Sequence, residues 1–360
     1  RVAWLSADYR LHPVAQALAG VLPRLDRSRI ESIGVGWGIA DDSGVREKLL
    51  AGFESFVPAE RLTDAEVAGL LREREIDIAV DLMGFTAESR PGILAARPAP
   101  VQVSYLGFAG TMGAPYIDHL IADEITLPER EAAHFTEQVL RLPGSYFPID
   151  NSRAIGPTPS RAAAGLPDDG FVFACFNNSY KHTPEMFDIW MRLLHQIDGS
   201  VLWLSPANPA AMRNIRREAE IRKVDPQRVI FARYVAEPEH HLARLGAAGL
   251  FLDTLPYNAH ATAADALLSG LPVITCKGRT FASRVAASLL HAAGLPELVT
   301  ADLGGYEQLA LSLARDSDAL RVCRQKLSTA RETQPLFDTA GYATRLADLL
   351  ISLRRSPVAG

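Results

Sequence analysis

The chain alternates short, continuous apolar segments with longer amphipathic ones, and this alternation limits its fold more than any other feature. Amphipathic stretches such as 13–25 and 63–76 separate the apolar segments of the first half. Those apolar segments are 2–8, 31–38, 76–85, 100–108 and 119–125. Short apolar strands that alternate with helices are typical of βα units, whose strands form a parallel sheet covered on both faces. We therefore expect an α/β fold.

A stretch rich in Pro, Ser, Gly and Asp interrupts this alternation at 151–168, which is the best candidate for a linker. Beyond it the apolar segments resume at 171–177, 200–206, 228–235, 250–255, 272–276 and 298–302. A chain of 360 residues is also longer than one hydrophobic core usually supports. We therefore expect two α/β domains, 1–150 and 169–337. A C-terminal helix within 338–360 is expected to pack back on the first domain.

The composition excludes several classes of protein. The formal net charge of −5 argues against a nucleic-acid or anionic-membrane binder. No run of about 18 uncharged apolar residues is present, so no membrane span is expected. The cysteines, Cys175, Cys276 and Cys323, lie far apart and form no CxxC motif, which indicates a reducing compartment and hence the cytoplasm. The chain starts directly in a strand, without Met or a signal peptide, as expected of a domain cut from a longer protein.

Ligands of parallel α/β sheets bind beyond the carboxyl ends of the strands, so functional residues are expected in the turns that follow the strands. In the turn DTLPYNAHATAAD, Thr262 and Asp265 fit a loose capping box at the start of a helix, and Gly270 fits its end. A helix N-terminus also attracts anions. Two interpretations stay open, a cap only or a phosphate and ribose site. His260 favours the second, because a cap does not require it.

A second turn, CFNNSYKHTPEM, places Lys181 between the end of a strand and the start of a helix. Thr183 and Pro184 are typical of the first helical positions. An ammonium group at such a place lies close to a bound phosphate, whereas the alternative is a solvated surface lysine. Asn177 and Asn178 fit either interpretation, as turn formers or as ligand donors.

Two further turns contain histidines. His12 precedes Pro13 at an expected helix start, where it is either a base or substrate contact or a structural histidine. His240 and His241 are adjacent, but no HExxH motif or second ligand pair supports zinc. The DxD at 316–318 lies in a helical stretch and is best explained as a surface turn or a helix cap. The absence of GxGxxG after the first strand and of a P-loop counts against a dehydrogenase and an NTPase.

Six segments of the chain carry a family resemblance when they are taken together. They are SADYRLHPVA, LAARPAPVQVSYLGFAGTMGAPYIDHLIAD, FNNSYKHTPEMFDIWMRLL, SVLWLSP, LFLDTLPYNAHATAADALLSGLPVIT and TFASRVAASLL. In this order, over nearly the whole chain, they resemble the catalytic region of the O-GlcNAc transferase/SPINDLY family of glycosyltransferases. The resemblance implies a GT-B fold, in which two Rossmann-like domains with parallel sheets face an interdomain cleft. It also implies tetratricopeptide repeats upstream.

The resemblance implies a role for individual residues. Lys181 matches the lysine that neutralises the donor diphosphate. His12 matches a histidine that has been considered as a base and is important for the acceptor site. Asn178 stands where the family often has an amide residue near the nucleotide. The other matches bind the nucleotide sugar: the backbone of Ala236 at the uracil, His241 beside the nucleotide, His260, Ala261 and Thr262 at the phosphates, and Asp265 at the ribose.

Two positions depart from the family's pattern. Animal members have Thr at the position of Ala261 and Lys at the position of Pro238, and both changes bear on donor affinity or nucleotide preference. The segment TFASRVAASLL is closer to the GlcNAc-transferring branch than to the plant SPINDLY branch, which uses GDP-fucose.

The expected activity is therefore inverting, metal-independent transfer of GlcNAc from UDP-GlcNAc to Ser or Thr hydroxyls of a protein acceptor, without a cofactor. The alternatives are a GDP-fucose O-fucosyltransferase, a UDP-glucose transferase, or an inactive scaffold that only binds sugar nucleotides.

Overall fold

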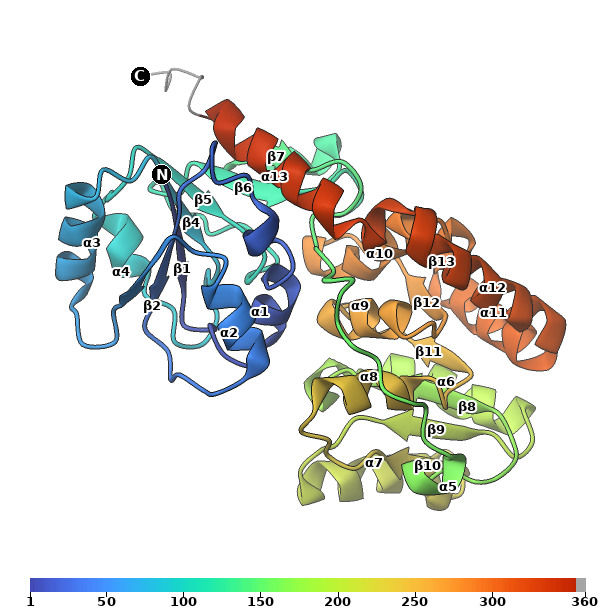
Figure 1. The fold of residues 1–360 in the computed structure, drawn as a ribbon. Helices are drawn as coiled ribbons and strands as arrows, with labels where there is room; N and C mark the ends of the chain where they lie inside the picture. Colours follow the sequence, from blue (N-terminus) through green and yellow to red (C-terminus); the bar gives the residue numbers. More distant parts are fainter. Residues whose placement is uncertain (354–360) are drawn as a thin grey trace. The chain divides into compact units, whose positions relative to one another are not determined.

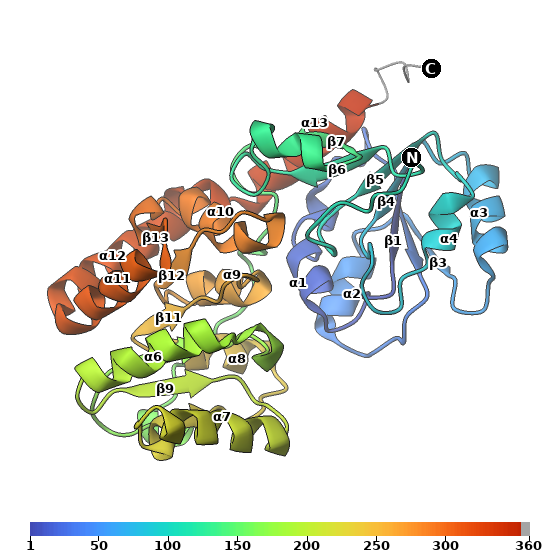
Figure 2. The ribbon, with the colours of Figure 1, turned by 180° about the vertical axis from the view of Figure 1, so that it is seen from behind.

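The computed structural model describes residues 1–353, which form two compact units (Figures 1 and 2). The first unit consists of Arg1–Ser152 together with the C-terminal helix α13, Thr339–Leu353. The second unit is Arg153–Phe337. Residues 153–168, which the sequence suggests as a linker, therefore cluster with the second unit. The last part of the expected C-terminal helix, 354–360, lies outside the described residues.

A parallel sheet of seven strands, in the order β3-β2-β1-β4-β5-β6-β7, forms the centre of the first unit. The strands are β1 Val2–Ser6, β2 Ser32–Gly36, β3 Ser55–Pro58, β4 Ile78–Asp81, β5 Val101–Ser104, β6 His119–Ala122 and β7 Gln138–Arg141. Val2 pairs with Ser32 on one side and with Ile78 on the other. All five expected strands are present. The two edge strands, β3 and β7, were not expected, because each is only partly buried and lacks a continuous apolar run.

Helices cover both faces of this sheet. In Figures 1 and 2, α1 (Pro13–Leu18) and α2 (Gly44–Leu50) lie on one face, and α3 (Asp64–Glu73) and α4 (Pro91–Ala95) lie on the other. The helix expected over 13–25 is thus shorter, and its second part is a 3-10 turn, η1, at Leu22–Arg24. A second 3-10 helix, η2, spans Glu129–His134.

Helix α13 completes the first unit. The hydroxyl of Tyr342 lies 2.5 Å from the Tyr105 hydroxyl and donates to the carbonyl oxygen of Tyr146. Thr339 Oγ1 donates to the carbonyl oxygen of Ile149 at 2.8 Å. The buried apolar face of the helix consists of Tyr342, Ala343, Leu346, Ala347, Leu350 and Leu353. The C-terminal helix is therefore an integral part of the first unit's core.

The second unit contains a parallel sheet of six strands in the order β10-β9-β8-β11-β12-β13. They are β8 Val172–Cys175, β9 Val201–Leu204, β10 Val229–Phe231, β11 Leu250–Leu252, β12 Val273–Cys276 and β13 Val299–Thr300. Each falls in an expected apolar segment. The strand order is that of a Rossmann fold, and it reverses between the neighbouring strands β8 and β11. Ligands of such sheets bind at this switch point.

The helices of the second unit also lie on both faces of its sheet. Helices α8 (Pro238–Leu245), α9 (Ala261–Leu268) and α10 (Val285–Ala292) pack in succession on one face, and α6 (Pro184–Gln196) and α11 (Leu303–Arg315) lie on the other (Figures 1 and 2). The remaining α-helices are α5 Arg161–Ala164, α7 Pro209–Ile221 and α12 Ser317–Thr333. The 3-10 turns are η3 Ser179–Lys181, η4 Pro226–Arg228, η5 Phe281–Ser283, η6 Pro296–Leu298 and η7 Pro335–Phe337.

The DxD sequence is a helix cap, which is one of the two explanations that the sequence left open. The Asp316 carboxylate accepts hydrogen bonds from the backbone N–H groups of Asp318 and Ala319 at the start of α12. None of the helices between residues 1 and 353 has the length and apolar character needed to cross a membrane.

Candidate active site

Two turns of the second unit meet at the point where its strand order reverses. The turn after β8 spans residues 176–183, and the turn after β11 spans residues 253–260. Because β8 and β11 are paired, parallel neighbours, both turns leave the same edge of the sheet. All the residues of the second unit that the sequence suggests for phosphate binding lie in these turns or in helix α9, which follows the second turn.

Asp253 anchors the second turn. Its Oδ1 accepts hydrogen bonds from the backbone N–H groups of Thr254, at 2.7 Å, and Ala259, at 2.5 Å. Its Oδ2 accepts from the Thr275 hydroxyl at 2.6 Å. Burial raises the pKa of Asp253 to about 6, although these donors act in the opposite direction. One buried carboxylate thus ties together both ends of the loop 254–259.

Lys181 is held against this loop. Its Nζ donates to the carbonyl oxygen of Asn258 at 2.8 Å and lies 4.1 Å from the centre of the Tyr257 ring. The side chain is half-buried, and burial lowers the pKa of Lys181 to about 8, with Asp253 opposing the shift. The lysine therefore stays mostly protonated at neutral pH. It is not the freely solvated surface lysine that the sequence left open.

Asn177 connects the two turns. Its Nδ2 donates to Thr254 Oγ1 at 2.8 Å, and its Oδ1 accepts from Thr262 Oγ1 at 2.5 Å. Asn177 is buried, whereas Asn178 is exposed and only caps η3 through a 3.5 Å contact with the Tyr180 N–H. The family resemblance pointed to Asn178 and missed the connecting role of Asn177. The available signal was the place of Asn177 directly after a buried strand.

Helix α9 begins at Ala261, two residues earlier than the predicted capping box would require. His260 is its N-cap residue, and no side chain among residues 1–353 caps its free N–H groups. The predicted capping box of Thr262 and Asp265 is therefore wrong, because Thr262 lies in the first turn and its hydroxyl donates to Asn177. The backbone N–H groups of the first turn and the partial positive charge of the helix remain available for an anion. Gly270 follows the helix with φ +78°, as predicted.

His260 is fixed beside Lys181. Its Nε2 lies 3.2 Å from the carbonyl oxygen of Ala282, and its ring stacks on Tyr257 with centroids 4.9 Å apart. Burial, and secondly the charge of Lys181, lowers the pKa of His260 to about 3. His260 is therefore neutral at physiological pH, and the positive charge at this end of α9 comes from Lys181 and the helix itself.

Asp265 lies one turn further along α9 and is the centre of a second group. Its Oδ1 accepts from Arg153 Nη1 at 2.6 Å, and its Oδ2 lies 3.7 Å from His241 Nε2. Arg244 Nη2 contacts His241 Nδ1 at 2.6 Å. Because a guanidinium can only donate, Nδ1 must accept, and the proton of the neutral imidazole is on Nε2, towards Asp265. Burial lowers the pKa of His241, which favours this neutral form.

The structure thus gathers most of the predicted residues of the second unit around the first turns of α9. They are Lys181, His241, His260, Ala261, Thr262 and Asp265. Two predicted residues are exposed and lie in loops: Asn178 after β8 and Ala236 between β10 and α8. Arg153 and Asn177 belong to the same network. Arg153 was not predicted, and Asn177 was named only as a turn former or ligand donor, not as the link between the two turns. Arg153 gave no local signal, because its partner is 112 residues away in the chain.

His12 belongs to the first unit, where it follows β1 and caps α1. Its Nδ1 lies 3.3 Å from the backbone N of Val14 and 3.4 Å from Asp8 Oδ2. The sequence left open that His12 is a structural histidine at a helix start, and this hydrogen bond to the Val14 N–H is present. Burial lowers the pKa of His12, although Asp8 opposes this, so the neutral form is favoured at physiological pH.

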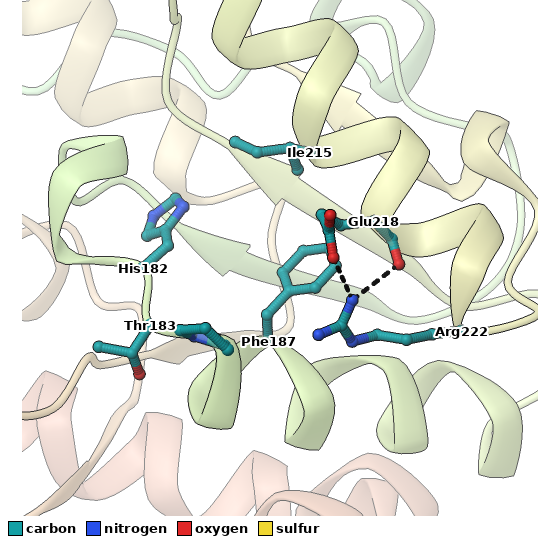
Figure 3. Close-up of a pocket in the computed structure, with 7 residues that line it drawn as sticks. His182, Thr183, Phe187, Ile215, Glu218 and Arg222 are labelled. Atoms are coloured by element: carbon teal, nitrogen blue, oxygen red, sulfur yellow. Dashed lines mark hydrogen bonds and ion pairs between the residues drawn. The ribbon is translucent and has the colours of Figure 1, made fainter.

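Two pockets lie outside these groups. One, of about 140 Å³, lies between the start of α6 and helix α7 in the second unit and is lined by His182, Thr183, Pro184, Phe187, Ile215, Glu218 and Arg222 (Figure 3). Burial lowers the pKa of His182 to about 4, so this lining imidazole is neutral. The other, of about 250 Å³, lies at the carboxyl ends of β1, β2 and β3 in the first unit. Neither is lined by a predicted site residue.

Among the described residues, no group of three or more His, Cys, Asp or Glu side chains is placed to hold a metal ion. The expected independence of metal and cofactors remains a prediction.

Two Rossmann-like units, one of which places a lysine and an uncapped helix N-terminus at its switch point, define a GT-B type of fold. A sequence profile of glycosyl transferase family 41 matches residues 1–157 and 154–346. The chain belongs to this family.

Three known proteins illustrate the relationship. The probable UDP-N-acetylglucosamine-peptide N-acetylglucosaminyltransferase SEC of Arabidopsis thaliana is 35% identical, over 96% of this chain and 36% of its own length. The probable UDP-N-acetylglucosamine-peptide N-acetylglucosaminyltransferase SPINDLY of Petunia hybrida is 30% identical, over 98% of this chain and 38% of its own length. A solved mutant of the Thermobaculum terrenum O-GlcNAc transferase is 29% identical with a TM-score of 0.90, over 99% of this chain and 67% of that one. The chain thus spans little more than a third of these two curated relatives.

Proposed function

We propose that this chain is the catalytic part of an inverting glycosyltransferase that moves GlcNAc from UDP-GlcNAc to Ser or Thr hydroxyls of proteins. The observation that carries the proposal is the position of Lys181, held by Asn258 and Tyr257 beside the uncapped start of α9. The names of the relatives, which are UDP-N-acetylglucosamine-peptide transferases, support the donor and the type of acceptor.

The chemistry that we propose needs positive charge at the diphosphate. The acceptor hydroxyl oxygen attacks the anomeric carbon from the face opposite the nucleotide, and the bond between that carbon and the phosphate oxygen breaks. The electron pair leaves with UDP, and the anomeric configuration is inverted. The Lys181 ammonium and the N–H groups at the start of α9 stabilise the charge where it develops. Since they supply this charge, we propose that the reaction needs no metal.

The hydroxyl proton requires an acceptor, and we propose His12. Its Nδ1 lies between the Val14 N–H and the Asp8 carboxylate. The tautomer that caps α1 accepts the Val14 N–H at Nδ1 and carries its proton on Nε2, so it cannot act as a base. Only the other tautomer, which gives up this cap and donates Nδ1–H to Asp8, leaves Nε2 able to take a proton. The competing possibilities are solvent and a phosphate oxygen of the donor.

The remaining nucleotide contacts are proposed from the family resemblance. Asp265 binds the ribose hydroxyls, His241 lies beside the nucleotide, and the backbone of Ala236 contacts the uracil. Asn178 is proposed near the nucleotide, and Asn177 holds the two phosphate turns together.

We propose a cytoplasmic location. The three cysteines, Cys175, Cys276 and Cys323, are buried free thiols, as is usual in reducing compartments.

Thermal melting with nucleotides tests the donor. UDP is expected to raise the melting temperature in proportion to its concentration, whereas GDP at the same concentration has little effect, because only a ligand of the native state stabilises it. The reverse preference would favour a GDP-sugar donor and contradict the proposal. Stabilisation by neither nucleotide would contradict any nucleotide-sugar function.

Intact-protein mass spectrometry tests the transfer itself. Incubation with UDP-GlcNAc and candidate acceptor proteins is expected to add a HexNAc mass to an acceptor, and the addition should continue in excess EDTA. A hexose or deoxyhexose adduct from UDP-glucose or GDP-fucose would assign another donor. Binding of UDP without any adduct would favour the inactive scaffold.

A further inference from the structure

We propose that Arg153 is a positioning residue of the donor site, which acts through Asp265 on the ribose of the bound nucleotide. The inference rests on the proposed function, because it places a ribose at Asp265. Arg153 is the first residue of the second unit and lies in the segment that the sequence suggests as a mere linker.

The contact between the two side chains fixes one oxygen of the carboxylate. Arg153 Nη1 lies 2.6 Å from Asp265 Oδ1, and the two side chains are only 15% and 11% exposed. A short, partly buried, charge-assisted hydrogen bond of this kind holds a carboxylate in one orientation. The other oxygen, Oδ2, is turned to His241 Nε2 at 3.7 Å, a separation longer than a hydrogen bond. Oδ2 is therefore the oxygen that can accept from a ribose hydroxyl.

The segment that carries Arg153 is itself attached to the helix that carries His241. The N–H of Gly156 donates to the carbonyl oxygen of Glu239 in α8 at 3.3 Å. Thr158 packs closely on Gly246, where a Cβ would come within 2.7 Å of the Thr158 hydroxyl. Residues 153–158, here called the strap, thus lie alongside α8 and contact both of its ends. Both neighbours of Asp265, Arg153 and His241, are placed by the strap and the helix beneath it.

Two arginines beside Asp265 have nitrogens without a hydrogen-bond partner in the described part of the chain, which argues against a purely structural ion pair. Arg153 Nη2 and Arg244 Nε are buried, and neither has a hydrogen-bond partner within residues 1–353. Buried donors in folded proteins are nearly always paired, and an unpaired donor calls for an explanation, of which a role in a functional site is one. Arg153 therefore holds Asp265 with one nitrogen while a second donor stays available next to the pair.

The test compares two nucleotides by isothermal titration calorimetry. UDP carries both ribose hydroxyls, and 2′,3′-dideoxyuridine diphosphate carries neither. The unmodified protein is expected to prefer UDP by roughly tenfold or more, as for a hydroxyl that donates to a carboxylate. Arg153→Gln is expected to lose most of that preference, because UDP binds more weakly while binding of the dideoxy analogue changes little.

A matched control removes another arginine from an ion pair in the same unit. Arg192 binds both carboxylate oxygens of Glu307, between α6 and α11 and away from α9. Arg192→Gln is expected to keep both affinities. Asp265→Asn should lose the preference as well, and Arg153→Gln added to it should cause no further loss, because Arg153 acts through Asp265.

The outcomes separate this inference from the proposed function. If the unmodified protein binds no UDP, the proposed function itself is wrong. If it prefers UDP and Arg153→Gln keeps that preference, Arg153 has no positioning role and the proposed function stands. If Arg153→Gln does not fold, Arg153→Lys replaces it, since lysine keeps the charge but not the planar fork. A reduced preference in a folded Arg153→Lys protein supports the inference, and an unchanged preference overturns it.

Discussion

The hydroxyl of Thr262 donates a hydrogen bond to the side-chain oxygen of Asn177 across 2.5 Å, and this bond joins helix α9 to the turn after β8. The nitrogen of the same amide donates to Thr254, in the turn after β11. The separation between Lys181 and the start of α9 is therefore fixed before any ligand binds. Groups placed in advance stabilise developing charge without reorganisation, which is an efficient way to catalyse departure of a diphosphate.

Asn177→Ala and Asn178→Ala form a pair that tests this connection. Asn177→Ala removes the amide that bonds to the buried Thr254 hydroxyl and to the partly buried Thr262 hydroxyl. It is expected to cost about 1–3 kcal/mol of unfolding free energy and to weaken UDP binding. Asn178→Ala changes an exposed residue, and its effect on stability is expected to stay within about 0.5 kcal/mol. Urea unfolding and calorimetry measure both. Equal effects of the two substitutions would refute the connecting role of Asn177.

Lys181→Met tests the proposed chemistry. Removal of the ammonium is expected to slow transfer on the order of 100-fold or more, because its charge is needed most in the transition state. The melting temperature should stay close to that of the unmodified protein. Lys326→Met is the control, since Lys326 makes an exposed ion pair with Glu297 and contributes little. Unchanged turnover in Lys181→Met would remove the mechanism.

UDP binding is expected to depend on pH through Lys181, whose pKa burial lowers to about 8. UDP prefers the protonated lysine, so its affinity is highest below this pH and falls as the pH rises through it. The decrease approaches about tenfold per pH unit at higher pH, until the pKa of the bound state is reached. Titrations at several pH values should show this decrease in the unmodified protein. If Lys181→Met showed the same decrease, another group would be responsible.

Asp8→Asn tests His12 as the base. An amide oxygen accepts a hydrogen bond from Nδ1–H less strongly than the carboxylate does. The tautomer of His12 that leaves Nε2 free to take a proton is therefore less favoured in Asp8→Asn. The expected result is a decrease in kcat on the order of tenfold, with little change in the KM for UDP-GlcNAc. Steady-state kinetics with a saturating acceptor measures both constants. An unchanged kcat in a folded Asp8→Asn protein would point to solvent or a donor phosphate oxygen as the base.

Leu346→Ala tests the attachment of α13. Leu346 is fully buried in the first unit, and its truncation is expected to cost about 2–5 kcal/mol through lost contacts and a cavity. Thr344→Ala, on the exposed face of the same helix, should have a much smaller effect. Urea unfolding compares the two variants. Similar stabilities would show that α13 contributes little to the core.

The sequence predicted the buried strands well, because a strand covered on both faces is a continuous apolar run. It failed for β3 and β7, whose positions at the edges of the sheet leave polar residues in a short strand. Turn chemistry identified Lys181 and His260, since both lie directly between a strand and a helix. It misassigned Thr262 as a capping residue, because local spacing does not reveal that the hydroxyl bonds to Asn177.

Residues whose role depends on distant contacts could not be predicted. Arg153 lies in a stretch rich in Pro, Ser and Gly, and only the folded chain brings it to Asp265. In the sequence, Asp253 looks like the end of a strand. In the structure its carboxylate accepts hydrogen bonds from both ends of the loop 254–259 and from Thr275, which lies on the neighbouring strand β12.

The return of the chain to its first unit through α13 has a consequence for synthesis. Domains usually fold as units while the ribosome makes them from the N-terminus. The surface that Tyr342 and Leu346 cover is made early, but these residues follow only after the whole of 153–337. An apolar surface of the nascent first unit therefore stays uncovered while the second unit is translated, and this interval is when a chaperone would protect the chain from aggregation.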